Sequence, residues 1–182
     1  MMKIYRIFNP SRRYKTISYN ETPIFNNMGK SIWDNIEEVS SFSYKWENDE
    51  EIKNICDCPF IIGSIPVFSE SAFSLLSSKL QSNDAQIIPI KVENLRYYII
   101  NANHQITGLL NKKKSHISYF SDGRIMDIEK YVFHNKHNIS PIFKITEFPT
   151  YTFINENIAS ILMKANITGI AVEQCKISFS LF

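Results

Sequence analysis

The chain has 182 residues, of which 44% are hydrophobic, so it holds enough apolar material for one core or at most two small domains. It contains 13 Phe, 9 Tyr and 2 Trp, while only 5 Gly and 7 Pro exclude collagen-like and linker-like chains. The formal net charge of +2 is too balanced to indicate a nucleic-acid groove or an anionic membrane as partner. We therefore expect a globular protein with neither nucleic acid nor membrane among its partners.

The cysteines and the N-terminus indicate the compartment. Cys56, Cys58 and Cys175 are odd in number and cannot close a disulfide framework, which is typical of a reducing environment. The first ten residues, MMKIYRIFNP, contain neither a long apolar segment nor a small-residue cleavage site. No apolar run approaches the roughly 20 residues that span a bilayer. We expect a cytoplasmic protein.

The N-terminal third predicts little regular structure. Loose alternation of apolar and polar residues favours short strands over Lys3–Phe8 and Lys15–Tyr19, with Pro10 between them. The stretch from Pro23 to Cys58 is irregular, with Trp33 and Trp46 as expected core residues. A helix is one interpretation of Asp49–Ile55. The acidic residues from Glu47 to Glu51 are typical of a solvated helix start.

The middle of the chain predicts a strand, a helix and two hairpins. Phe60–Ile62 is a short apolar strand, and Ser69 is a plausible N-cap for a helix. The apolar face of that helix comprises Ala72, Phe73, Leu76 and Leu80.

The first hairpin joins a strand over Ile88–Val92 to a strand over Leu95–Asn101, with Glu93-Asn94 as its turn. Pro89 lacks an N–H and therefore indicates an edge position or a bulge. The second hairpin pairs Ile117–Phe120 with Arg124–Phe133, and its Asp122-Gly123 turn is typical of type I′. The basic run from Lys112 to Lys114 before it is interpreted as a solvated turn.

The C-terminal region repeats the middle of the chain in coarse form. Pro141–Ile145 predicts a strand, and Phe153-Ile154-Asn155-Glu156 matches Val67-Phe68-Ser69-Glu70 as an apolar pair, a cap and a glutamate. A helix and a strand over Ile167–Val172 follow. Duplication and a recurrent packing solution both explain this pattern. The apolar face of this second helix comprises Ile158, Ile161, Leu162 and Ala165.

These patterns predict an α+β fold, mainly an antiparallel sheet with hairpins plus two amphipathic helices in strand-helix-strand units. We expect one compact domain overall. In it, residues 1–58 form irregular N-terminal strands and loops packed on the core, and residues 59–182 form the α+β core.

The sequence offers no recognisable catalytic apparatus. His134 and His137 lie in a polar, loop-like segment without nearby carboxylate or thiolate ligands, so a surface loop is the preferred interpretation. His104 and His116 have no nucleophile or paired carboxylate at diagnostic spacing. Cys56 and Cys58 are too close together for a C-x-x-C motif, and no phosphate-binding glycine loop occurs. We expect no catalytic residue, no metal ligand, no cofactor and no enzymatic activity.

The C-terminal pattern resembles a family of bacterial polymorphic-toxin immunity proteins, the one numbered eleven, whose members end in "lFrl … ifvSeel … aLeeagltGi.f". The matching runs are Ile142–Ile145, Phe153–Glu156, Ile161-Leu162 and Ala165–Ile170. Earlier segments agree in the same order, so the resemblance covers about Phe60 to Val172. Asn155 stands where the pattern has Ser, and Asn166 where it has Gly, although Asn can also form a left-handed helix cap. Those earlier segments are Pro66–Glu70 with the Leu75-Leu76 helix, Ile87–Val92 and Tyr97–Asn101.

The resemblance implies a cytosolic protein that binds and neutralises a cognate toxin, encoded next to it, by occluding the toxin's active surface or blocking its activation. Inhibitors of this kind depend on aromatic anchors and complementary charge. A basic toxin would be steered by the acidic run. Two alternatives remain: a generic interaction or regulatory domain, and an unrecognised enzyme with a pocket that collects His104, His116 or carboxylates. The candidate partner-binding residues are Tyr14, Tyr19, Trp33, Trp46, Asp49, Glu50 and Glu51.

Overall fold

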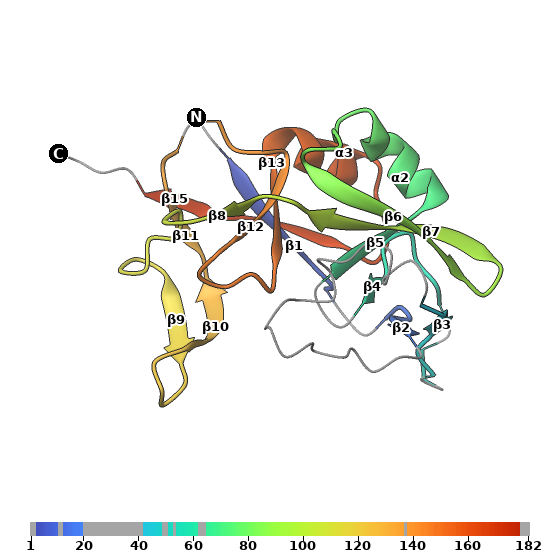
Figure 1. Ribbon diagram of the computed structural model, residues 1–182, viewed down its shortest axis with the longest axis horizontal. Coiled ribbons are helices and arrows are strands. Elements are labelled where there is room, and N and C mark those ends of the chain that lie inside the picture. The colour runs from blue at the N-terminus through green and yellow to red at the C-terminus, as the bar shows by residue number, and fades with distance from the viewer. Residues whose placement is uncertain are drawn as a thin grey trace.

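The computed structural model describes residues 3–10, 13–19, 42–48, 51–52, 54–61, 65–136 and 138–178. These residues form an α+β fold that is mostly β-structure, with two helices and mixed sheets (Figure 1). The longest strand pairings are antiparallel, and four shorter pairings among these residues are parallel.

Six strands close into a barrel that the sequence does not predict. They are β2 (Ile17–Tyr19), β3 (Tyr44–Trp46), β4 (Phe60–Ile61), β5 (Ile65–Ser69), β6 (Ala85–Val92) and β7 (Leu95–Ala102), in the order β2-β3-β6-β7-β5-β4. Closure depends on single residue pairs, Tyr44 with Val92 and Ile17 with Ile61. The interior is filled by alternate strand residues such as Val67, Ile88 and Ile99, each fully buried.

A five-stranded sheet carries the second half of the fold. Its strands are β1 (Ile4–Phe8), β8 (Gln105–Ile106), β12 (Ile142–Ile145), β13 (Thr152–Asn155) and β14 (Ala171–Gln174), in the order β14-β1-β13-β12-β8. The N-terminal strand β1 thus lies inside this sheet, between β13 and β14.

The helices α2 (Glu70–Ser77) and α3 (Glu156–Lys164) lie together on the upper side of the molecule in Figure 1. Their buried residues Leu76 and Leu162 join one core cluster with Phe60 of the barrel and Ile7 of the sheet. This shared core ties the two halves together.

The same local topology occurs around both helices. Each helix directly follows one strand, β5 or β13, and a loop after it leads to another, β6 or β14. The two flanking strands do not pair with each other in either case. Instead β7 lies between β5 and β6, and β1 lies between β13 and β14, each antiparallel to both neighbours.

Capping residues define the starts of both helices, as the sequence predicts. The Ser69 hydroxyl accepts a hydrogen bond from the Ala72 amide at 3.3 Å, and the Asn155 side chain accepts one from the Ile158 amide at 3.1 Å. Asn166 follows the α3 cap with a φ of 52°, which confirms its predicted left-handed conformation.

Gly169 marks a close contact between the C-terminal region and the barrel. Its φ is +83°, and a Cβ atom there would lie 2.3 Å from the Cys56 sulfur. Beside it, the Thr168 hydroxyl donates to the Asp57 carboxylate at 2.6 Å, and the Cys58 amide donates to the Thr168 carbonyl at 2.9 Å. The Thr-Gly pair of the C-terminal pattern is therefore a determinant of the fold.

A two-stranded arm projects from the body. It consists of β9 (His116–Tyr119) and β10 (Ile125–Lys130), while β11 (Val132–His134) pairs with β15 (Lys176–Ser178) near its base (Figure 1). The predicted hairpin is confirmed, but its returning strand ends at Lys130, because Val132 and Phe133 belong to β11, and its type I′ turn is wrong. Of the two predicted turn residues, Asp122 and Gly123, only Gly123 has a positive φ, whereas a type I′ turn needs two. The Gly123 amide donates to the Phe120 carbonyl at 3.0 Å, which is typical of a type I turn followed by a left-handed glycine.

Two further expectations differ from the structure. The strand expected over Ile167–Val172 begins only at Ala171, because positive φ angles at Asn166 and Gly169 keep the preceding residues in turns. In the Asp49–Ile55 segment, the part that the structure describes contains no helix, and Asn54 instead forms a bridge with Tyr14.

Candidate partner-binding site

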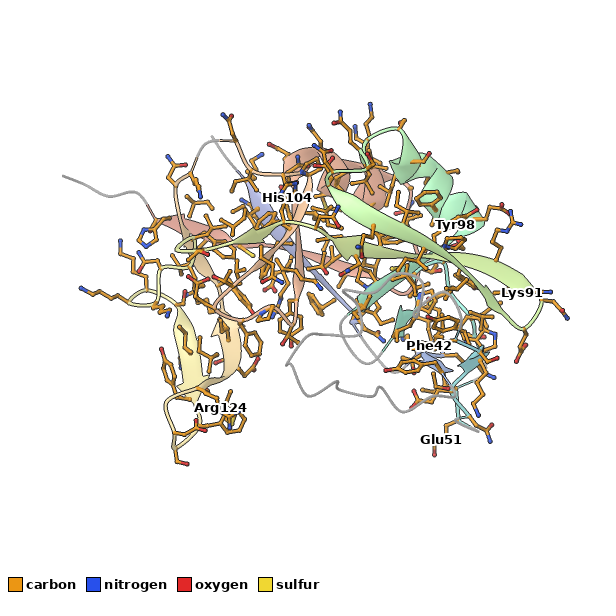
Figure 2. The ribbon with its side chains drawn as sticks, in the orientation of Figure 1. Phe42, Glu51, Lys91, Tyr98, His104 and Arg124 are labelled. Carbon is orange, nitrogen blue, oxygen red and sulfur yellow. The ribbon has the colours of Figure 1, made fainter. Side chains whose placement is uncertain are left out.

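A groove of about 780 Å³ opens between the β3 segment and the β6–β7 hairpin. Figure 2 shows Lys91 on the β6–β7 hairpin and Phe42 near β3. The lining residues are Phe42, Ser43, Tyr44, Pro89, Ile90, Lys91, Glu93, Asn94 and Arg96. The groove thus combines buried apolar side chains with polar and charged ones.

Phe42 and Tyr44 of the lining form an aromatic cluster with Tyr19 behind them. Tyr19 stacks on Phe42 with ring centroids 5.3 Å apart and an interplanar angle of 11°, and Tyr44 meets Tyr19 edge-on at 6.3 Å. Phe42 and Tyr44 are buried, and burial raises the pKa of the Tyr44 hydroxyl above its ordinary value. Aromatic rings contribute large apolar areas to binding surfaces.

The β6–β7 hairpin places two cations opposite each other at the groove. Its turn is Glu93-Asn94, as predicted, so Lys91 pairs with Arg96 across the ladder. Like charges directly opposite each other on adjacent strands are destabilising. The Glu70 carboxylate compensates Arg96 only from 3.4 Å, and both side chains are about two-thirds exposed.

The same hairpin explains Pro89. Pro89 pairs with Tyr98 of β7, whereas on its other side β6 pairs with β3 only through Val92. Among the described residues, no strand lies beside Pro89 on that side to accept a hydrogen bond from its backbone, so the missing N–H costs nothing there. The predicted edge position agrees with this geometry, and the edge borders the groove.

None of the predicted partner-binding residues that the structure describes lines the groove, although Tyr19 stacks on Phe42, which does. Trp46 lies inside the barrel, 8% exposed, with its ring edge-on to Tyr97 at 5.6 Å, which fits its interpretation as a core residue. Tyr14 is half-buried in a bridge with Asn54, and Glu51 is exposed. The candidates Trp33, Asp49 and Glu50 lie outside the described residues.

Lys91 and Arg96 were not predicted as binding residues, although the sequence contains the information that places them opposite each other. Both side chains follow from the predicted two-residue turn, because the residues next to such a turn pair with each other and the next residues outward do the same. Applying that register to the sequence places Lys91 opposite Arg96. Phe42 and Tyr44 had no comparable local pattern.

A second cavity of about 430 Å³ contains His104 and belongs to a different part of the molecule (Figure 2). It also collects Asp84 and Ser140, the residue types of a catalytic triad. The Ser140 hydroxyl, however, donates to the Asp84 carboxylate at 2.9 Å, whereas a triad serine donates to histidine. The other Asp84 oxygen accepts the Gln81 amide at 3.0 Å, so this carboxylate stabilises a turn.

The other histidines form no site among the described residues. His116 lies on the exposed arm, where its Nδ1 is 2.7 Å from the Glu129 carboxylate. No group of three potential metal-ligating His, Cys, Asp or Glu side chains occurs in the described part of the chain, and His137 lies outside it.

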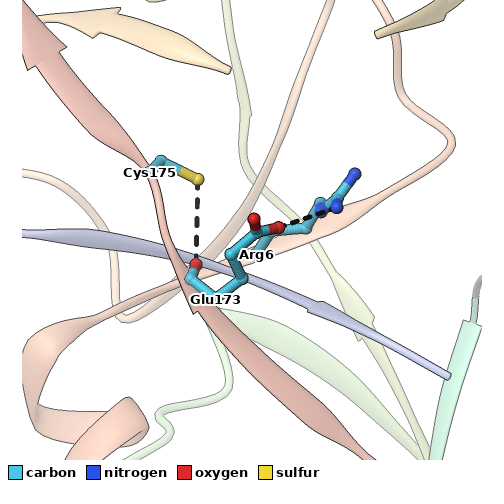
Figure 3. A network of polar contacts seen from close by, with 3 residues as sticks. All are labelled: Arg6, Glu173 and Cys175. Atoms are coloured by element: carbon cyan, nitrogen blue, oxygen red, sulfur yellow. Dashed lines mark hydrogen bonds and ion pairs between the residues drawn. The ribbon is translucent and has the colours of Figure 1, made fainter. Parts of the chain in front are cut away.

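The three thiols are buried and unreactive in character. Burial raises the pKa of Cys56 to about 12 and that of Cys58 well above its usual range. Cys175 lies near Arg6, which pairs with Glu173 at 2.7 Å (Figure 3). Burial outweighs the nearby guanidinium and raises the pKa of Cys175 to about 12. The interpretation of Cys56 and Cys58 as small buried thiols is therefore confirmed.

No protein-family model matches this chain, and no curated protein matches it. The resemblance to the immunity family thus rests on the residue patterns given above. Within the described residues, no helix is long and apolar enough to cross a membrane.

Proposed function

We propose that this protein is an immunity protein of bacterial type, which binds a cognate toxin and neutralises it without catalysis. The observation that carries the proposal is the groove in which the facing Lys91–Arg96 pair and the buried rings of Phe42 and Tyr44 occur together. A locally unfavourable charge arrangement at a surface groove is the kind of feature that proteins retain for binding. The family-like pattern over about Phe60 to Val172 supports the same proposal.

The groove determines which kind of partner fits. Lys91 and Arg96 face each other with Glu70 compensating Arg96 from 3.4 Å, so an Asp or Glu side chain of the toxin would lower the remaining repulsion. An apolar side chain beside that acid packs on Phe42 and Tyr44. Bound in this way, the immunity protein covers the toxin surface that presents these groups.

The generic interaction domain would use the same groove on a cellular protein other than a toxin. Co-expression separates the two functions, because only an immunity protein rescues cells from a toxic neighbour. The enzyme alternative is disfavoured by the His104 cavity, where Ser140 donates to Asp84 and is not aligned as a nucleophile.

The test is co-expression of this chain with the product of the adjacent upstream gene, measuring cell survival and co-purification. We expect survival together with a stable complex. A neighbour that is harmless alone, or one that stays toxic and forms no complex, would contradict the immunity function for that pair.

A second experiment separates the groove from the acidic run. Steering by the acidic run predicts that Glu51→Lys slows association and lowers its dependence on salt. Docking in the groove predicts that Lys91→Glu together with Arg96→Glu has the larger effect. Stopped-flow association rates of both variants with the purified toxin, measured at several salt concentrations, decide between these two surfaces.

A further inference from the structure

The β9–β10 arm exposes apolar side chains that the rest of the molecule leaves uncovered. Tyr119, Phe120 and Met126 are each about half exposed, whereas Ile128 is buried and Ile117 packs against the same core cluster. Figure 1 shows the arm extending away from the body, and Figure 2 places Arg124 at its tip. Exposed aromatic residues on a projecting ribbon are typical of an interaction surface.

The two edges of the arm are built differently. The β10 edge has two register irregularities and carries Asp127, Glu129 and Lys130, which are devices that prevent strand pairing. The β9 edge, His116-Ile117-Ser118-Tyr119, contains no Asp, Glu, Lys, Arg or Pro. Among the described residues, β9 pairs with β10 alone, so its other edge is open.

We propose that the open edge of β9 pairs antiparallel with β9 of a second copy of this chain and forms a twofold-symmetric dimer. The two arms then form one four-stranded sheet in the order β10-β9-β9-β10. This proposal is independent of the toxin, since it concerns the chain alone.

The register of the arm shows which backbone groups are available. The Phe120 amide donates to the Arg124 carbonyl at 2.8 Å, so Phe120 faces β10. Because hydrogen-bonding direction alternates along a strand, the backbone groups of Tyr119 and Ile117 face the open edge. A twofold axis at Ser118 pairs Ile117 of each copy with Tyr119 of the other, and each such pair exchanges two hydrogen bonds.

The side chains are self-complementary in this register. Ile117 beside Tyr119 forms an aromatic and β-branched pair, which favours strand association. Ser118 meets its own copy without a charge conflict. The antiparallel arrangement directs each tip, where Asp122 already pairs with Arg124 at 2.7 Å, toward the base of the other arm.

The first test is the molar mass of the purified chain over a wide dilution series, measured by light scattering after size-exclusion chromatography. We expect twice the monomer mass of 21.2 kDa at high concentration and dissociation on dilution. Ser118→Lys places two like charges on the twofold axis and is expected to give a monomer. The matched control Met126→Lys adds the same charge on the β10 edge and is expected to remain dimeric.

The second test is a disulfide across the axis. Ser118 occupies a non-hydrogen-bonded pair, where the Cα atoms of facing residues are about 4.5 Å apart and within disulfide range. Mild oxidation of Ser118→Cys is therefore expected to give a covalent dimer, while the native cysteines stay buried and unreactive. A wild-type chain that is monomeric at every concentration, or equal cross-linking of a Met126→Cys control, would overturn the proposal and leave the edge to a strand of another protein.

Discussion

At the scale of single residues, Gly169 shows how a sequence pattern acquires a physical cause. The Thr168-Gly169 pair belongs to the family-like pattern, and Gly169 packs against Cys56 so closely that any Cβ atom there collides with the sulfur. We expect Gly169→Ala to lower the free energy of unfolding by roughly 2–4 kcal/mol, because overpacking adds to backbone strain. Chemical denaturation measures this loss.

Gly123 provides the matched control for that substitution. Its φ is +84°, nearly the same as that of Gly169, but a Cβ atom there meets nothing within 4 Å. Gly123→Ala should therefore cost only the backbone strain, about 1 kcal/mol. Equal losses for the two variants would show that the contact with Cys56 contributes nothing.

The buried thiols predict how stability depends on pH. Burial raises the pKa of Cys56 and Cys175 to about 12, whereas thiols in the unfolded chain ionise near 8.5. As the pH rises, the thiols therefore lose their protons first in the unfolded state. Their contribution to the free energy of unfolding is fully present below about pH 8.5 and is lost between about pH 9 and 12. Each thiol contributes a slope of about 1.4 kcal/mol per pH unit.

Equilibrium unfolding in urea from neutral to alkaline pH measures this slope. Tyr97, whose pKa burial raises to about 12, adds to the fall above pH 10. Replacing Cys175 by Ala should make the curve less steep by the contribution of one thiol. A free energy of unfolding that stays constant up to pH 11 would contradict the burial of these groups.

At the scale of elements, local patterns predicted more than long-range pairing did. Both helix caps, the β6–β7 hairpin and the β9–β10 hairpin follow from neighbouring residues and are present. The barrel does not, because β2, β3 and β4 are two or three residues long and close it through single pairs such as Ile17 with Ile61. Such contacts between distant segments leave no period in the sequence.

The end of α3 supplies a prediction at this scale. Asn166 holds a φ of 52°, which Asn tolerates, Gly adopts freely and Ala disfavours. We expect Asn166→Ala to destabilise the protein by about 1 kcal/mol and Asn166→Gly to be neutral or slightly stabilising. Thermal unfolding of both variants checks this order, and the reverse order would mean that the Asn side chain stabilises the cap.

At the scale of the whole molecule, the groove was only partly predictable. Tyr19 was a candidate from its position outside the family-like core, and the structure brings it against Phe42. Lys91 and Arg96 line the groove. They belong to a hairpin that was predicted from the sequence but not proposed as part of a binding site. The groove depends on barrel closure, so a complete prediction of the site required the long-range topology.

The second cavity supplies a functional prediction for the whole protein. If neutralisation needs no catalysis, His104→Ala leaves protection of cells against the toxin unchanged, because His104 lines a cavity outside the groove. Survival is measured against wild type at matched protein levels. A loss of protection with the fold intact, judged by circular dichroism, would instead support the enzyme alternative.

The most direct test of binding through the groove is the dissociation constant of the complex with the purified toxin, measured by calorimetry. The double variant Lys91→Glu and Arg96→Glu should weaken binding about tenfold or more, because charged pairs in an interface contribute at least about 1.5 kcal/mol. Its control, Lys112→Glu and Lys113→Glu, makes the same change of charge far along the chain from the groove and should bind like wild type. Equal affinity of the groove variant and wild type would contradict the account.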